Sequence, residues 1–210
     1  MRRTAARAAL AGALAVVAPL LAACAGDTDG GLLAAPPSRV EVDTPELRRL
    51  REEAGIEPCR APAPADPVEG GLPELALGCL GGGETVELSA LRGPAVVQLW
   101  ASWCGPCRRE LPLFQTFHER HGERVQVLGV NTQDQMLSTA LELLDETGAT
   151  FPHVADPGAD LTAVDDMPIR GLPGIVLVDA EGRVAYRELR EVTSVEELEQ
   201  LVTDELGVRL

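Results

Sequence analysis

The hydrophobic pattern from residue 72 onward alternates between short apolar runs and amphipathic stretches. Residues 95–101 and 125–131 are mostly apolar, as expected of central strands that are covered on both faces. Residues 105–121 and 136–144 instead repeat their apolar side chains at helical spacing, which predicts two helices. Each predicted helix therefore follows a predicted buried strand.

Shorter elements complete this pattern. Four further strands form two pairs, each joined by a turn that contains glycine: residues 74–80 with 85–88, and 174–179 with 183–187. Ser194 and Glu197 have the spacing of a capping box, which predicts the start of a last helix. The sequence therefore predicts an α/β fold with a central mixed sheet, helices on both faces and an N-terminal hairpin extension.

The first residues predict an export signal followed by a tether. Residues 1–7 contain three Arg and no acidic residue, and residues 8–23 are 16 apolar or small residues. This combination is typical of a signal peptide over residues 1–23, and it is short for a membrane-spanning helix, which needs about 20 apolar residues. An uncleaved anchor is the alternative. Residues 24–43 are rich in Gly, Pro and Asp and are predicted to be a flexible tether.

Residues 44–71 are predicted to form an accessory segment between the tether and the main domain, which covers residues 72–210. Thr44 is placed to cap a short helix with Pro45 at its first position. A loop rich in Pro and Gly follows this helix and contains Cys59.

Composition excludes several classes of partner. The chain has 210 residues with 18 basic residues, all of them Arg, and 33 acidic residues, which gives a formal charge of −15. Nucleic-acid binding depends on Lys and Arg that neutralise phosphates, so this balance argues against it. It also argues against electrostatic docking onto an anionic membrane.

The candidate chemistry lies in Cys104-Gly105-Pro106-Cys107, between a predicted buried strand and a predicted helix. Two cysteines at i and i+3 in a first helical turn are close enough to form a disulfide. Free backbone N–H groups at the helix N-terminus favour a thiolate at Cys104, and a thiolate is the attacking species in thiol–disulfide exchange. The motif therefore predicts a redox site, with an inert structural disulfide as the alternative.

Metal binding is the other alternative for this motif. A structural zinc site needs four ligands, and only His118 and His121 follow at short spacing, further along the same predicted helix. His153, Asp156 and Asp160 also form a loose set of potential ligands, but they lie around a strand end and a Pro-Gly turn, so we interpret them as loop residues.

Cys59 and Cys79 are isolated in the sequence. In an exported protein they are expected to form a structural disulfide that ties the accessory segment to the first hairpin. Closing a loop of this length stabilises the fold by about 3 kcal/mol. The alternative is a second redox pair that exchanges with Cys104 and Cys107.

The motif at the strand–helix junction also carries a family resemblance. Residues 101–107 (ASWCGPC) resemble the active site of the thioredoxin superfamily, and residues 96–112 (VVQLWASWCGPCRRELP) are more similar to its membrane-tethered TlpA/ResA type than to cytosolic thioredoxin. The resemblance extends over about residues 72–206 and implies a thioredoxin-like fold.

The resemblance also implies roles at three further positions. Gly171-Leu172-Pro173-Gly174 matches the family's cis-proline loop, which implies a cis peptide bond at Pro173 and substrate contacts at Trp103, Leu172 and Pro173. Gly174 departs from the Thr that often follows this proline.

The resemblance implies a proton-transfer residue as well. Thioredoxin has a buried acid six residues before its first cysteine, where this chain has Gln98. The tethered family has a Glu three residues after its second cysteine, and Glu110 matches that position. Cys107 and Glu110 share a helix face, so a buried Glu110 is expected to exchange a proton with Cys107.

Residues 21–24 (LAAC) resemble a bacterial lipobox, which implies lipidation of Cys24 and attachment to the extracytoplasmic face of the cell membrane. The resemblance implies a reductase of protein disulfides, such as those of apocytochrome c or of copper-site proteins, that an integral membrane electron carrier reduces again. No organic cofactor or metal is needed, because the cysteines carry the electrons. The alternatives are an oxidase that donates disulfides to exported proteins and a copper chaperone that binds Cu(I) through the two cysteines.

Overall fold

The computed structural model describes residues 40–164 and 170–210. The predicted signal peptide, Cys24 and most of the predicted tether lie outside the described residues. Within the described part of the chain, no helix is long and apolar enough to cross a membrane.

A seven-stranded mixed sheet forms the centre of the fold, in the order β2-β1-β5-β4-β3-β6-β7. Its strands are β1 (Ala76–Cys79), β2 (Val86–Glu87), β3 (Ala95–Trp100), β4 (Gln126–Thr132), β5 (His153–Asp156), β6 (Gly174–Val178) and β7 (Val184–Leu189). β3, β4 and β5 are parallel, whereas β1, β2, β6 and β7 pair antiparallel with their neighbours. The predicted mixed sheet and the β1–β2 hairpin are therefore confirmed.

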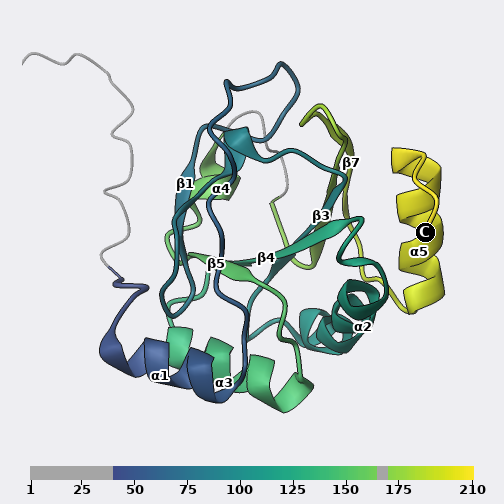
Figure 1. Cartoon of the computed structure of the whole chain (residues 1–210). Coiled ribbons are helices and arrows are strands. Elements are labelled where there is room, and N and C mark those ends of the chain that lie inside the picture. The colour runs from purple at the N-terminus through teal and green to yellow at the C-terminus, as the bar shows by residue number, and fades with distance from the viewer. Residues whose placement is uncertain (1–39, 165–169) are drawn as a thin grey trace, which may run out of the picture. The chain divides into compact units, whose positions relative to one another are not determined.

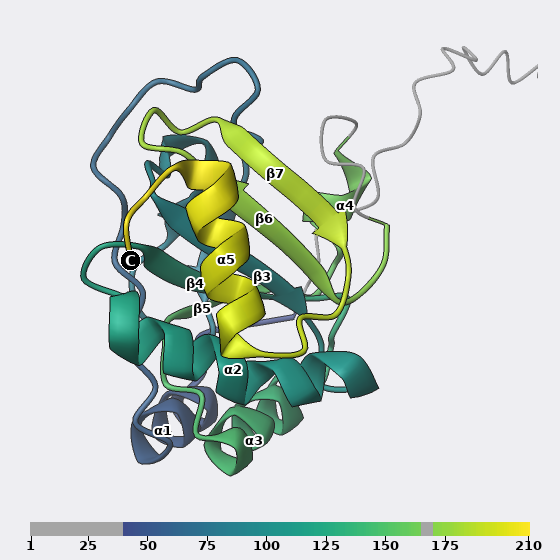
Figure 2. The same ribbon diagram turned by 90° about the vertical axis from the view of Figure 1, so that its right-hand side faces the viewer.

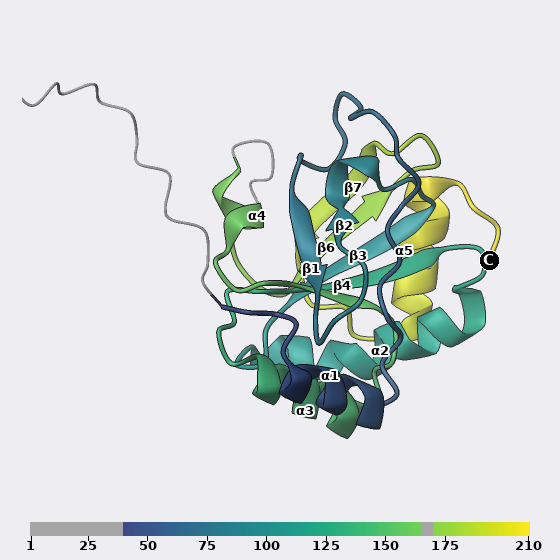
Figure 3. The same ribbon diagram turned by 60° about the vertical axis from the view of Figure 1, so that its left-hand side comes forward.

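The helices lie on both faces of this sheet, with four of the described helices on one face and a short one on the other. They are α1 (Pro45–Glu53), α2 (Gly105–His121), α3 (Leu137–Thr147), α4 (Asp160–Ala163) and α5 (Val195–Leu206), with a 3-10 turn at Leu88–Ala90. In Figure 1, α1, α2 and α3 lie below the sheet, and Figure 2 shows α5 crossing β6 and β7. Figure 3 shows α1 and α3 side by side, with α4 on the far side of the sheet from them.

Two hydrophobic clusters cover the two faces. Successive side chains on a strand point to opposite faces, and β3 follows this rule: Val96 and Trp100 belong to one cluster and Val97 and Leu99 to the other. The first cluster contains the buried faces of α1, α2, α3 and α5. Every residue of β3 is buried, including the polar Gln98.

For one strand the sequence indicated only an end and no bounds, and this strand corrects the interpretation of His153. His153–Asp156 form β5, buried between β1 and β4, so these residues do not belong to a loop. The His153 ring packs on Gly129, where a Cβ would lie only 2.9 Å from its Cγ and closer still to its Nδ1. Its Nδ1 accepts a hydrogen bond from Trp100 Nε1 at 3.1 Å, and burial lowers the pKa of His153 to about 3.

The accessory helix α1 is joined closely to the rest of the fold. The Thr44 Oγ1 accepts a hydrogen bond from the Leu47 N–H at 3.2 Å, which caps the helix as predicted. Leu47 is buried in the first hydrophobic cluster, which also contains the buried faces of α2, α3 and α5. The Arg51 Nε donates to the Gly81 carbonyl at 3.0 Å. The segment before β1 is therefore packed against the sheet and α3.

Candidate active site

The redox motif lies where β3 ends and α2 begins. Cys104 is the N-cap residue of α2, and its Sγ accepts a hydrogen bond from the Cys107 N–H at 3.3 Å. Cys104 and Cys107 form a disulfide with a Cα–Cα distance of 5.3 Å. Once this bond is reduced, the helix N-terminus and the Cys107 N–H would both stabilise a thiolate at Cys104.

The turn before Cys104 is held by the loop between β4 and α3. The Trp103 side chain is 54% exposed, and its Nε1 donates to the Gln133 carbonyl at 3.0 Å. The buried Asp134 carboxylate accepts from the Ser102 N–H at 2.7 Å and from the Met136 N–H at 3.2 Å. Sequence reasoning missed both loop residues, although Asp is a residue type that accepts from the backbone two residues further on and so marks a turn.

The proline loop lies at the end of the sheet where β3 ends and β6 begins, which is also where the redox disulfide lies. The Leu172–Pro173 peptide bond is cis, and Pro173 directly precedes β6. β6 is antiparallel to β3, and Gly174 pairs with Leu99 near the end of β3. Leu172 is half-buried, and its backbone has no hydrogen-bond partner among the described residues. Trp103, Leu172 and Pro173 therefore gather at the edge where β3 ends.

Glu110 is 1% exposed and lies on the same helix as Cys107. One carboxyl oxygen, Oε1, accepts from the Val192 N–H at 2.5 Å, and Oε2 accepts from the Gln98 Nε2 at 3.3 Å. Burial raises the pKa of Glu110 to about 7, although both hydrogen bonds oppose the shift. An acid with this pKa can both accept and release a proton at neutral pH.

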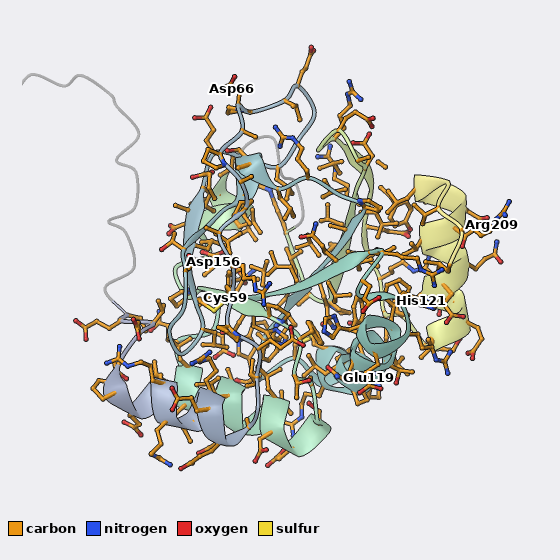
Figure 4. All side chains as sticks on the ribbon, viewed as in Figure 1. Cys59, Asp66, Glu119, His121, Asp156 and Arg209 are labelled. Carbon is orange, nitrogen blue, oxygen red and sulfur yellow. A yellow bond between two sulfur atoms is a disulfide. The ribbon has the colours of Figure 1, made fainter. Side chains whose placement is uncertain are left out.

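The second disulfide joins Cys59 to Cys79, with a Cα–Cα distance of 5.6 Å. Both residues are buried in the cluster that also contains Val97 and Leu99, on the opposite face of the sheet from Cys104 and Cys107. Figure 4 shows Cys59 inside the fold, beside β1 and β5. The sheet separates the two disulfides, so they cannot exchange directly in this fold.

The histidines of α2 are engaged in ion-pair geometry with acids. His118 Nε2 lies 3.1 Å from Glu57 Oε1, and His121 Nε2 lies 2.8 Å from Glu199 Oε1, near α5 in Figure 4. Across residues 40–164 and 170–210, no group of three or more His, Cys, Asp or Glu side chains could hold a metal ion.

Thioredoxin-like thiol–disulfide oxidoreductases are defined by a mixed sheet, a Cys-x-x-Cys disulfide at the start of the helix after its central strand, and a cis-proline at the same end of the sheet. The chain belongs to the Redoxin family, whose model matches residues 67–202.

Known relatives agree with this assignment. The chain is 32% identical to thiol-disulfide oxidoreductase ResA of Halalkalibacterium halodurans, over 59% of this chain and 70% of that protein. It is 26% identical to sporulation thiol-disulfide oxidoreductase A of Bacillus subtilis, over 53% of this chain and 68% of that protein. The chain is therefore an enzyme of thiol–disulfide exchange, of the ResA type.

Solved structures show the same fold. A putative thiol:disulfide interchange protein DsbE from Chlorobium tepidum aligns with a TM-score of 0.57 and 28% identity, over 68% of this chain and all (100%) of that one. A secreted thiol-disulfide isomerase from Corynebacterium glutamicum aligns with a TM-score of 0.55 and 26% identity, over 64% of this chain and 86% of that one.

Proposed function

We propose that this protein is an exported, lipid-anchored reductase of protein disulfides. The observation that carries the proposal is the placement of Cys104 at the N-terminus of α2, with Cys107 and the buried Glu110 following on the same helix. This arrangement supplies a nucleophile, a resolving thiol and a proton acceptor within two helical turns.

The reaction starts from the reduced pair. The Cys104 thiolate attacks a partner disulfide, which forms a mixed disulfide and releases one partner sulfur as a thiolate. Cys107 then transfers its proton to Glu110, and its sulfur attacks the Cys104 sulfur. The bond between Cys104 and the partner breaks, the second partner sulfur leaves as a thiolate, and the Cys104–Cys107 disulfide forms. The partner gains two electrons, and the enzyme loses two.

The surface around Cys104 is suited to an extended substrate segment. Trp103, directly before Cys104, offers an exposed apolar ring. The Leu172 backbone next to Pro173 has no hydrogen-bond partner within the described part of the chain, so a substrate strand can pair with it. In this proposal these three residues bind the substrate while the cysteines exchange.

Export is supported by sequence pattern and by the cysteines. Residues 1–23 are proposed as the signal peptide, Cys24 as the lipidated residue and residues 24–43 as the tether, ahead of an accessory segment (44–71) and the redox domain (72–210). The buried Cys59–Cys79 disulfide fits an oxidising compartment. The similar protein of Corynebacterium glutamicum is described as secreted.

We assign the reducing direction because Gly105-Pro106 between the cysteines matches reducing thioredoxins. The proposed substrates are apocytochrome c or proteins of copper-site assembly, and an integral membrane electron carrier would reduce the pair again. A donor of disulfides to exported proteins would use the same residues with the opposite electron flow.

A trapping experiment tests this function. The full chain with Cys24→Ala and Cys107→Ala is reduced and mixed with an oxidised Cys-x-x-Cys-His peptide, and the products are analysed by mass spectrometry. We expect a mixed disulfide at Cys104 in this variant, none in Cys104→Ala, and a reduced peptide with wild-type protein. A wild-type reaction that leaves the peptide oxidised, or that oxidises a reduced peptide instead, would contradict the proposed reductase.

A further inference from the structure

Gln98 is a fully buried polar residue in the middle of the central strand β3. Its Nε2 donates to Glu110 Oε2 at 3.3 Å, whereas its Oε1 has no hydrogen-bond partner among the described residues. A buried amide oxygen without a donor is costly, so its presence next to a titrating acid calls for an explanation.

The hydrogen bond between Glu110 Oε1 and the Val192 N–H determines which carboxyl oxygen can bind a proton. Oε1 accepts the Val192 N–H at 2.5 Å, and a backbone N–H can only donate. The acid proton is therefore expected on Oε2, the oxygen that faces Gln98. With the amide in its observed orientation, that proton would point at the Gln98 NH2 group, which is also only a donor.

We propose that Gln98 is a positioning residue whose side-chain amide turns over whenever Glu110 gains or loses its proton. The NH2 group donates to the carboxylate, and the turned amide presents Oε1 as the acceptor for the carboxylic acid. The inference rests on the proposed function, in which Glu110 receives the proton of Cys107. A 180° rotation exchanges Oε1 and Nε2 with almost no change in shape.

Counting unpaired groups favours the rotation. In the observed orientation, Gln98 Oε1 is the atom of this pair that lacks a partner among the described residues. Protonation of Glu110 without rotation would add an unpaired acid proton and weaken the bond from Nε2. Rotation gives the acid proton an acceptor and leaves the NH2 group unpaired in place of Oε1, so both protonation states keep a hydrogen bond to Oε2.

Among the described residues, none of the charged side chains around Glu110 donates a hydrogen bond to its carboxyl group, whereas the neutral Gln98 does. The carboxylates of Glu191 and Glu197 both favour the protonated form of Glu110. Arg109, the adjacent cation on α2, pairs with Glu191 at 2.8 Å, and Arg190 pairs with Glu197. Within the described part of the chain, the Glu110 carboxyl group accepts hydrogen bonds from Gln98 and the Val192 N–H and from neither of these cations.

Gln98 therefore acts on the resolving step. As the Cys107 S–H bond gives its proton to Glu110 Oε2, the sulfur attacks Cys104 and the partner leaves as a thiolate. The turned amide then holds the new acid proton until it is released. Without Gln98, the carboxylate loses a charge-assisted hydrogen bond and the acid loses a weaker neutral one, so proton affinity rises.

The resolving step can be measured with dithiobis(nitrobenzoate) as the probe. In the full chain with Cys24→Ala, reduced protein releases one thionitrobenzoate when Cys104 attacks, and a second when Cys107 resolves the mixed disulfide. In stopped flow, we expect the rate of the second release to rise with pH around a midpoint near 7.

Gln98→Met keeps the length of the side chain and removes both its donor and its acceptor. We expect its midpoint to rise by about one pH unit, with about a fivefold slower second release at pH 7 and an unchanged first release. Val96→Ala is the matched control, because Val96 is buried on the same face of β3. A purely structural effect would appear equally in both variants and would overturn the proposal.

Nuclear magnetic resonance tests the rotation itself. In wild-type protein, we expect contacts between the Gln98 NH2 protons and the Glu110 methylene groups at pH 9 and their loss at pH 5. Contacts that persist at both pH values would overturn the inference. Glu110→Gln distinguishes failure of the proposed function from failure of the Gln98 inference. If this variant leaves the pH profile of the second release unchanged, the proposed role of Glu110 fails. If it flattens the profile while Gln98→Met does not shift it, only the role of Gln98 fails.

Discussion

Replacing Glu110 with Gln should make the protein more stable and its resolving step slower. The substitution keeps the size of the side chain and lets its carbonyl oxygen accept the Val192 N–H, which now lies 2.5 Å from Glu110 Oε1. The new NH2 group then faces Gln98, whose Oε1 otherwise has no partner among the described residues. The introduced amide is therefore expected to fit without leaving additional polar groups unpaired.

The magnitude follows from the pKa of Glu110, which burial raises from 4.5 to about 7. Between these values the folded state holds a proton that the unfolded state has released, so wild-type stability falls as the pH rises through this window. Each pKa unit corresponds to about 1.4 kcal/mol, so the full cost above pH 7 is about 3 kcal/mol. Gln cannot ionise, so E110Q avoids this cost.

Urea unfolding of the oxidised proteins at pH 4.5 and pH 8 measures the effect. We expect E110Q to match wild type at pH 4.5 and to exceed its free energy of unfolding by about 3 kcal/mol at pH 8. Glu119→Gln, which removes an exposed acid from the same helix, is the matched control and should change stability by less than about 0.5 kcal/mol. Equal differences between E110Q and wild type at both pH values would refute the reasoning.

Three further predictions concern the rest of the fold. Gly129→Ala should destabilise the protein by about 3 kcal/mol or more, because its Cβ would overlap the His153 ring. Gly105→Ala is the control and should be tolerated, because the nearest neighbour of its Cβ would lie at 4.0 Å. Urea unfolding compares the free energies of unfolding of the two variants. Burial lowers the pKa of His153 from 6.5 to about 3 in the folded state. Between these pH values, His153 is protonated in the unfolded state and neutral in the folded state. Calorimetry in the E110Q background should therefore show stability falling as the pH drops from 6.5 to 3, and a flat profile would refute this. Replacing Cys59 and Cys79 with Ala should lower the free energy of unfolding by about 3 kcal/mol and leave the exchange rate unchanged; a slower exchange would contradict a purely structural disulfide.

The sequence predicts those parts of the fold that local patterns encode. The run at residues 95–101 marks a buried strand because it is mostly apolar, and Cys104 with Cys107 marks the start of the next helix because the motif fits a first turn. The bounds of β5 were missed because its four residues include His153 and Asp156, which are polar. They are buried only because β1 and β4 enclose them, and no local pattern reports that contact.

The environment of Glu110 shows the same limit. Its position three residues after Cys107 predicts a shared helix face, but its burial depends on packing between distant segments. Val192 lies 82 residues away in the sequence and Gln98 lies on a different element. The identity of Gln98 suggested only the loss of a titrating acid, and its hydrogen bond to Glu110 became visible in the structure.

The reduction potential of the Cys104–Cys107 pair tests the central claim most directly. The full chain is equilibrated with dithiothreitol or glutathione buffers of known potential, with the buried Cys59–Cys79 disulfide intact, and the thiols of the redox pair are counted. The reductase account predicts a potential close to that of thioredoxin, about −270 mV. A value near about −120 mV, typical of a strong disulfide donor, would contradict it.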